Sequence, residues 1–228
     1  MRYRVQVLGW TLIWSGLFIF GYLGWQLYGT DWVNAGVQAE AAGELEEVLA
    51  VADPEPEAVA TEGLLDVETV AYTPEDPVAV GESFGFLSVP RLGIEHLVIY
   101  EGTDRETLKK GPGHMEVTPL PGQPGNAVLS GHRTTYGRPF FDFDLLVQGD
   151  RIEVETAVGV HVYEVRSTTV VLPTDVWVID PRPGGWLTLT TCNPKFSARE
   201  RLVVFAEMVA GPNLDYVELD RARYGEPS

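Results

Sequence analysis

The sequence predicts an all-β domain, a barrel or a sandwich, preceded by one membrane-spanning helix. Between residues 84 and 209, seven short apolar runs are separated by Gly, Pro and Asp. Several of them alternate with period two, and β-branched or aromatic residues dominate, as is typical of strands. Helical patterns in this stretch are few and short. Seven or eight short strands with few helices favour a barrel or a sandwich.

The N-terminal helix is predicted from a run of 26 residues, 5–30, that contains no charged side chain. About 20 mainly apolar residues suffice to cross a bilayer. Arg2 and Arg4 precede the run, and basic residues on the short side favour a cytoplasmic N-terminus. A cleaved signal peptide is the alternative, but the run is long for one and the small residues at 39–43 lie far beyond it. We therefore expect residues 1–30 to be an uncleaved single-pass anchor in the cell membrane, with the domain outside.

An acidic linker is predicted between the anchor and the domain. Residues 31–82 contain 14 of the 33 Asp and Glu residues and no Lys or Arg. Residues 37–52 fit a short amphipathic helix, and the Pro-interrupted stretch 53–77 is expected to be extended or disordered. We interpret the whole segment as a solvated spacer. The acidic balance and the lack of a basic patch argue against nucleic-acid binding.

The folded domain is expected to span residues 83–212, with a C-terminal tail at 213–228. Its candidate strands are 84–89, 96–100, 126–131, 151–156, 161–171, 186–191 and 201–209. One or two helical turns are expected within 103–113, where Gly111 and Pro112 end the pattern, and another short helical piece within 140–146.

The only cysteine, Cys192, ends the strand 186–191. A single thiol excludes an internal disulfide and a Cys-rich zinc site, which leaves a buried packing residue, a surface thiol or a nucleophile. His132 stands in the same way just after the strand 126–131. If 186–191 and 201–209 form a hairpin, Arg201 begins the return strand opposite Cys192. The three side chains would then meet at one rim of the domain.

These three residue types can divide the work of acyl transfer. A thiol with a pKa of about 8.5 is mostly protonated at neutral pH, and a histidine can accept its proton and later protonate a leaving amine. An arginine can donate hydrogen bonds to a developing oxyanion. His96 and His161 fall in strands and His114 in a Gly/Pro loop, so we interpret them as structural. On the residues alone, packing and catalysis both stay open for Cys192.

Three motifs in this order resemble the sortase family. They are "LSGHR" (129–133), "TLTTC" (188–192) and "ARERLVV" (198–204), which are similar to the segments with the sortase histidine, cysteine and arginine. The resemblance extends over residues 84–209 and is strongest to class E sortases. Asn193 departs from that class, in which histidine often follows the cysteine.

The resemblance implies an eight-stranded β-barrel with short helices and a cysteine transpeptidase activity. Sortases cleave a sorting signal of the type Leu-Pro-x-Thr-Gly, or Leu-Ala-x-Thr-Gly for class E, between Thr and Gly. Cys192 would be the nucleophile, His132 the general acid and base, and Arg201 the oxyanion or substrate-positioning donor. Thr191 would contact the substrate backbone or orient the thiol.

The implied partners are proteins with C-terminal sorting signals and an amine acceptor, either a cell-wall precursor or a pilin lysine. No metal and no other cofactor is expected. Two alternatives stay open: a cysteine endopeptidase that only hydrolyses its substrate, and a membrane-tethered β-domain without chemistry, for which Cys192 would be dispensable.

Overall fold

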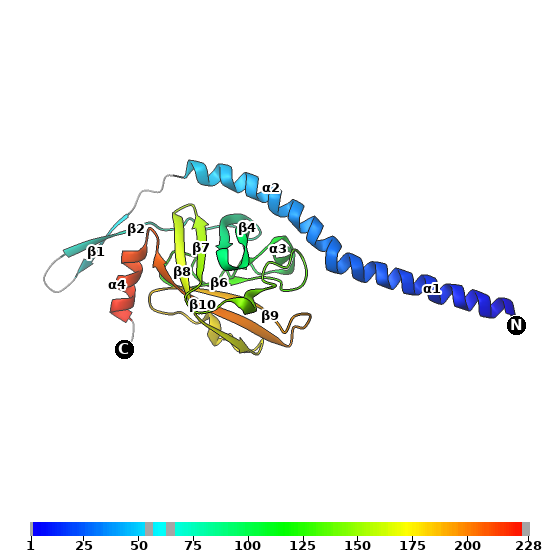
Figure 1. The fold of residues 1–228 in the computed structure, drawn as a ribbon. Helices are drawn as coiled ribbons and strands as arrows, with labels where there is room; N and C mark the ends of the chain where they lie inside the picture. Colours follow the sequence, from blue (N-terminus) through cyan, green and yellow to red (C-terminus); the bar gives the residue numbers. More distant parts are fainter. Residues whose placement is uncertain (1, 53–56, 63–66, 225–228) are drawn as a thin grey trace.

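Eight strands between residues 83 and 210 close into a barrel in the computed structural model, which describes residues 2–52, 57–62 and 67–224 (Figure 1). Around the barrel the order is β10-β8-β7-β3-β4-β5-β6-β9, and β9 pairs with β10 to close it. The strands are β3 (Ser83–Val89), β4 (Ile94–Glu101), β5 (Gly113–His114), β6 (Gly125–Ser130), β7 (Arg151–Thr156), β8 (Gly159–Val171), β9 (Gly185–Asn193) and β10 (Glu200–Ala210). The predicted β-barrel is confirmed.

Alternation along the strands fills the barrel. Side chains that face inward are apolar and fully or almost fully buried, since successive residues of a strand point to opposite faces. The interior includes Leu87, Ile99, Leu129, Val154, Tyr163, Leu187, Leu189, Val204 and Met208. A second apolar cluster lies on the outer face of β8 and β10, where Val171, Val203 and Phe205 pack with Val178.

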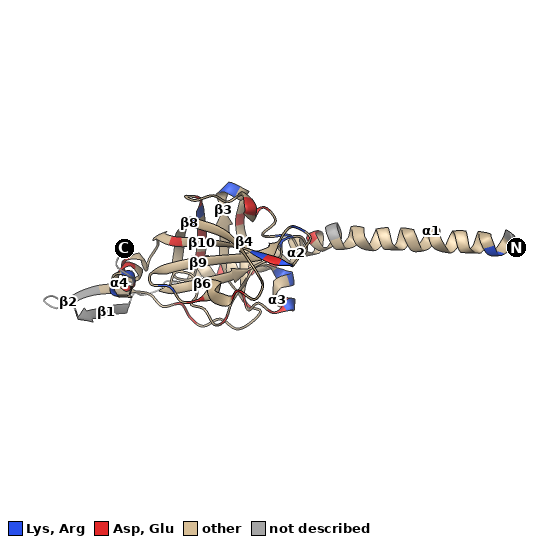
Figure 2. Ribbon diagram, turned by 90° about the horizontal axis from the view of Figure 1, so that it is seen from below, with Lys and Arg blue, Asp and Glu red and all other residues tan. Residues whose placement is uncertain are grey.

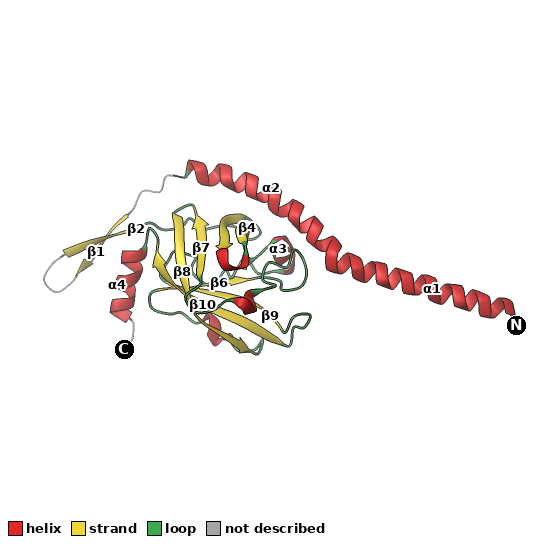
Figure 3. Ribbon diagram, viewed as in Figure 1, coloured by secondary structure: helices red, strands yellow, loops and turns green. Residues whose placement is uncertain are grey.

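The helical pieces within the domain are short (Figure 3). Helix α3 (Arg105–Lys110) lies in the predicted stretch 103–113, and the side chain of Asp104 caps it by accepting hydrogen bonds from the backbone amides of Glu106 and Thr107. The remaining pieces are the single turns η2 (Pro90–Leu92), η3 (Phe143–Leu145) and η4 (Val176–Ile179). Of these, η3 lies in the predicted stretch 140–146.

The N-terminal run is helical and projects away from the barrel as α1 (Arg2–Gly24). Within the part of the chain that the structure describes, one helix is long and apolar enough to cross a membrane, Tyr3–Gly24, and none of it is buried in the protein. Figure 2 shows α1 without charged residues except at its N-terminal end. The helical backbone continues without a break through η1 (Trp25–Gly29) into α2 (Thr30–Val51).

The interpretation of residues 31–82 as a solvated spacer is wrong for α2, which packs against the barrel. Leu45 is 3% exposed and packs with Phe86, Val98 and Tyr100 of β3 and β4. The amide of Gln38 pairs with the backbone of Val98 in both directions, at 2.9 and 3.2 Å. The acidic side chains lie mainly on the remaining faces of the helix, which explains why composition suggested a spacer.

Two strands, β1 (Glu57–Glu62) and β2 (Val67–Tyr72), pair antiparallel within the stretch that was expected to be extended or disordered. The flanking residues 53–56 and 63–66 lie outside the described residues. Just after β2, the backbone of Thr73 exchanges two hydrogen bonds with the side-chain amide of Asn213, at 2.9 and 2.8 Å. This pair attaches the end of β2 to the segment that follows β10.

The expected C-terminal tail is a helix, α4 (Leu214–Tyr224), that completes the core. Val217 is fully buried among the interior side chains, and the Asp220 carboxylate accepts a hydrogen bond from Gly184 at 2.9 Å. The helix is polar over most of its surface, so a single buried Val gave the sequence no apolar pattern from which to predict it. Residues 225–228 lie outside the described residues.

The packing of α2 predicts that Leu45→Ala destabilises the protein. Truncation of a buried leucine costs about 2–5 kcal/mol, whereas Val48→Ala on the same helix, where the side chain is 63% exposed, should cost less than about 0.5 kcal/mol. Urea unfolding of the full chain in detergent micelles, followed by near-ultraviolet circular dichroism, measures both. Equal effects of the two substitutions would show that α2 does not pack on β3 and β4.

Candidate active site

The ends of β6, β9 and β10 lie side by side and place the three predicted catalytic residues together. In the antiparallel pair of β9 and β10, Cys192 is directly opposite Arg201, where Cβ atoms are about 5 Å apart. Strand β6 runs parallel to β9 with Ser130 beside Thr190, and the Gly131 amide donates to the Thr190 carbonyl at 3.1 Å. His132 and Cys192 each follow two residues after this last pair, so both lie at the same end of the barrel.

The thiol lies on the outer face of the barrel. Leu187 and Leu189 point into the core, so the alternation of β9 turns Cys192 to the other side. Cys192 and Arg201 are both partly exposed and share this outer face. A nucleophile at this position can be reached from solvent while its strand stays anchored in the core.

His132 begins the connection that follows β6, and a close backbone approach fixes it there. A Cβ on Gly131 would lie 2.7 Å from the ring of Phe140, so only glycine fits before the histidine. The carbonyl of His132 accepts a hydrogen bond from the Phe140 amide at 3.2 Å. The imidazole ring of His132 packs on the ring of Tyr136, with centroids 5.1 Å apart. Burial lowers the pKa of His132 below its ordinary value, which favours a neutral imidazole that can accept a proton.

Arg133 is a further functional residue that the motif analysis did not single out. Its side chain is buried, and one guanidinium nitrogen donates to the Cys192 carbonyl at 3.1 Å and to the Asn193 side-chain oxygen at 2.8 Å. The other terminal nitrogen pairs with Asp144 at 2.8 Å. Arg133 thus joins the histidine segment to the backbone of the cysteine. Its position next to His132 in "SGHRT" was the available signal.

Thr191 lies beneath the rim, next to Cys192 in β9. The side chain is 3% exposed and points inward, on the opposite face from Cys192. Its hydroxyl donates to the Gly131 carbonyl at 2.7 Å. Of the two roles predicted for Thr191, substrate contact or orientation of the thiol, this geometry favours the second.

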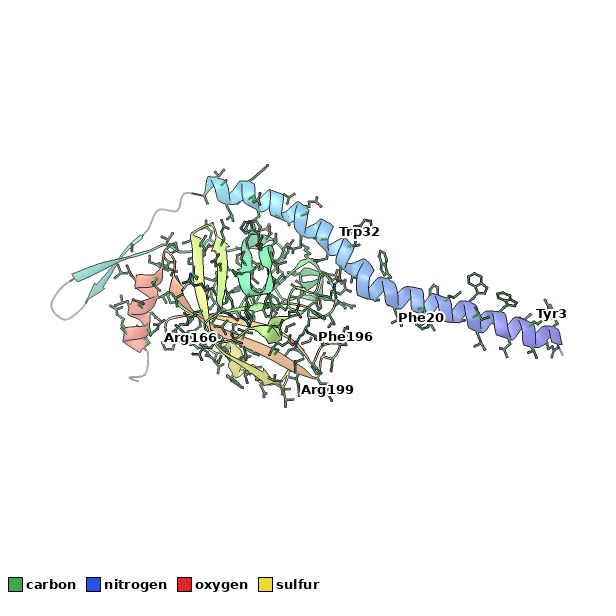
Figure 4. The ribbon with its side chains drawn as sticks, viewed as in Figure 1. Tyr3, Phe20, Trp32, Arg166, Phe196 and Arg199 are labelled. Carbon is green, nitrogen blue, oxygen red and sulfur yellow. The ribbon has the colours of Figure 1, made fainter. Side chains whose placement is uncertain are left out.

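The connection between β9 and β10 forms the other wall of the site. Lys195 pairs with Asp142 at 2.9 Å, which joins this connection to the one that follows His132. The Arg201 guanidinium donates to the carbonyls of Ala198 and Glu200, at 3.1 and 3.0 Å. Figure 4 shows Arg199 at the outer end of this connection, and that side chain is exposed. Arg201 itself is partly exposed at this rim.

The other histidines are structural. His114 is 1% exposed, with Nδ1 2.7 Å from the Glu101 carboxylate and Nε2 2.9 Å from the Pro119 carbonyl. His161 is fully buried in β8. Among residues 2–52, 57–62 and 67–224, no group of three or more His, Cys, Asp or Glu side chains is arranged to hold a metal ion.

Comparison with known proteins identifies relatives of the barrel domain. The sortase domain model matches residues 87–209. The chain is 37% identical over 145 residues to sortase SrtE1 of Streptomyces coelicolor, covering 57% of this chain and 41% of that protein. It is 32% identical over 205 residues to sortase D of Bacillus subtilis, covering 87% of this chain and 96% of that one.

A solved structure gives the same result for the fold. Sortase E from Streptomyces avermitilis aligns with a TM-score of 0.54 and 37% identity, over 66% of this chain and 97% of that one. The barrel, the order of the three motifs, and a family match over more than half of the chain agree. The chain belongs to the sortase family of cysteine transpeptidases.

Proposed function

We propose that this chain is a membrane-anchored sortase that cleaves a Leu-Pro-x-Thr-Gly or Leu-Ala-x-Thr-Gly signal and transfers the new acyl group to an amine. The observation that supports this most is the alignment of three strand ends, which brings His132, Cys192 and Arg201 to one outer rim. The match to the sortase domain over residues 87–209 supports it independently. The preference for class E rests on the identity to the Streptomyces enzymes.

In the proposed reaction the imidazole of His132 takes the proton of the Cys192 thiol, and the sulfur attacks the threonine carbonyl carbon. Arg201 donates hydrogen bonds to the oxygen that becomes negative. The carbon–nitrogen bond to glycine then breaks, and His132 returns its proton to the leaving amine. The thioester that remains is opened by an acceptor amine, which releases the free thiol.

Apolar side chains beside the rim support a peptide substrate with an apolar residue. Val171, the last residue of β8, is directly opposite Arg201. The connection that follows it exposes Leu172, Val176 and Trp177, which are 56%, 67% and 47% exposed. We propose that the leucine of the signal binds here. The acceptor would be a cell-wall precursor or a pilin lysine.

We propose further that α1 spans the cell membrane once, with the N-terminus in the cytoplasm and the barrel outside. The length and apolar character of Tyr3–Gly24 support an anchor, and Arg4 at its start supports the orientation. The exterior is also where exported substrates and cell-wall amines occur. Protease protection of each terminus in intact cells would decide the orientation.

The direct test is to incubate the protein with each signal peptide, with and without an amine such as triglycine. We expect cleavage between Thr and Gly, a covalent acyl adduct on Cys192 by mass spectrometry, and a transfer product only when the amine is present. Cys192→Ala and His132→Ala should each abolish turnover and keep the unfolding transition of the parent, because both lie at strand ends. Hydrolysis without transfer would identify an endopeptidase, and turnover by Cys192→Ala would refute the nucleophile.

Arg201 should matter without exchanging a proton. Loss of one oxyanion donor typically costs about 10²–10³ in rate. Arg201→Lys keeps the charge but loses the planar fork, so it should stay impaired. Arg199→Ala is the matched control, since Arg199 is exposed two residues earlier. Measuring kcat/KM for the three variants side by side tests this, and a defect in Arg199→Ala alone would mean that the arginine is misassigned.

The pH dependence should follow from the burial of His132. Because burial lowers the pKa of His132, the imidazole stays neutral to lower pH. In a plot of kcat/KM against pH, the midpoint of the acid limb should therefore lie below the ordinary histidine pKa of about 6.5. Tyr136→Ala removes the ring that covers the imidazole and should move the limb upward. Pro139→Ala, in the same connection, is the control. If the midpoint of the acid limb were the same in Tyr136→Ala as in the parent, this explanation would be contradicted.

A further inference from the structure

The connection that follows His132 contains three consecutive residues in the left-handed region. Tyr136, Gly137 and Arg138 have φ values of 53°, 76° and 49°. Glycine adopts such values readily, but tyrosine and arginine do so only when surrounding contacts hold them there. The hydrogen bond from the Phe140 amide to the His132 carbonyl joins residues on either side of 136–138 and does not hold these three residues themselves.

Helix α2 supplies contacts at this stretch. One carboxylate oxygen of Asp31 accepts a hydrogen bond from the Gly137 amide at 3.1 Å, and the other pairs with Nε of Arg138 at 2.8 Å. A Cβ on Gly137 would lie 2.1 Å from the side-chain oxygen of Asn34, so the helix is in direct contact with the backbone here. These contacts join residues more than 100 positions apart in the chain.

The helix that presents Asp31 is itself fixed to the barrel. The amide nitrogen of Asn34 donates to the carbonyls of Lys109 and Lys110 at the end of α3, at 2.9 and 2.8 Å. Gln38, one turn later, bonds the backbone of β4 at Val98. Asp31 is therefore held from a rigid element, and in its turn holds the strained stretch.

The strained stretch begins at the residue that covers the imidazole. Tyr136 directly precedes Gly137, and its ring packs on that of His132. A connection released at Gly137 and Arg138 would let Tyr136 leave the left-handed conformation and admit water to the imidazole. Tyr136 packs on the imidazole from its own connection, which also carries Arg138. Cys192 and Arg201 lie at the rim on β9 and β10, and Asp31 reaches the connection from α2.

We propose that Asp31 is a positioning residue for His132. Its carboxylate holds Gly137 and Arg138 so that Tyr136 stays against the imidazole and the ring keeps its place beside Cys192. The inference rests on the proposed function, because it gives Asp31 a role in that reaction. The segment before the barrel is then part of the catalytic apparatus, although it touches no reacting atom.

The test uses the full chain in detergent micelles with the variants Asp31→Asn, Asp31→Glu and Arg138→Gln. Misplacement of a catalytic group by about 1 Å can cost up to about 10²-fold in rate. We expect Asp31→Asn and Arg138→Gln to lower kcat by about tenfold or more with little change in KM, and to move the acid limb upward. Asp31→Glu should recover part of the loss. Glu47→Gln makes the same charge change at an exposed site of α2 and should match the parent.

A pH titration of the His132 ring-proton chemical shifts by NMR measures the pKa of His132 without a substrate. The pKa of His132 should rise in Asp31→Asn and Arg138→Gln and stay in place in Glu47→Gln. If the parent cleaves no signal peptide, the proposed function fails, and a raised pKa would still show that Asp31 orders the histidine connection. If both variants keep the parent kcat and the parent pKa of His132, the inference is wrong. Should Asp31→Asn fail to fold, Arg138→Gln decides alone.

Discussion

The parallel pairing of β6 with β9 is the constraint on which the site depends. His132 and Cys192 are 60 positions apart, and they meet because Ser130 and Thr190 are in register and both chains continue in the same direction. Parallel strands cannot be joined by a tight turn, so the chain between them contributes β7 and β8 to the far side of the barrel before it returns. The core side chains Leu129 and Leu189 fix this register, because a slip by one residue would turn the apolar side chains outward.

The two faces of β9 do different work. The inward side chains secure the strand. At its end, the Thr191 hydroxyl donates to the Gly131 carbonyl after β6, and Arg133 donates to the Cys192 carbonyl. Only after this end is fixed does the outward Cys192 have a defined position. In the proposed reaction this arrangement separates stability from reactivity: Cys192 lies outside the core, and the residues that hold its strand end, Thr191 and Arg133, are buried.

Much of this could be predicted from the sequence, because the signals are local. Period-two alternation predicted the seven longer strands, and the motifs around His132, Cys192 and Arg201 predicted the site. The two-residue strand β5 was too short to form a pattern. Helix α4 has one buried apolar residue, which no periodicity reveals. Arg133 was not singled out, since nothing local shows that its partners lie at Cys192 and Asn193.

The N-terminal segment shows more clearly that long-range contacts cannot be predicted from local sequence patterns. Its acidic composition suggested a spacer, and composition cannot show that Asp31 meets a strained stretch more than 100 positions away. The contact joins two requirements that conflict within the barrel. The histidine connection must be open enough to admit a substrate, yet its imidazole must stay beside the thiol. A contact from a separate helix resolves this conflict, because it holds the connection from its outer side and leaves the face toward Cys192 free. Because α2 continues from α1 with an unbroken helical backbone, the helix that we propose to hold the histidine connection is continuous with the proposed membrane anchor.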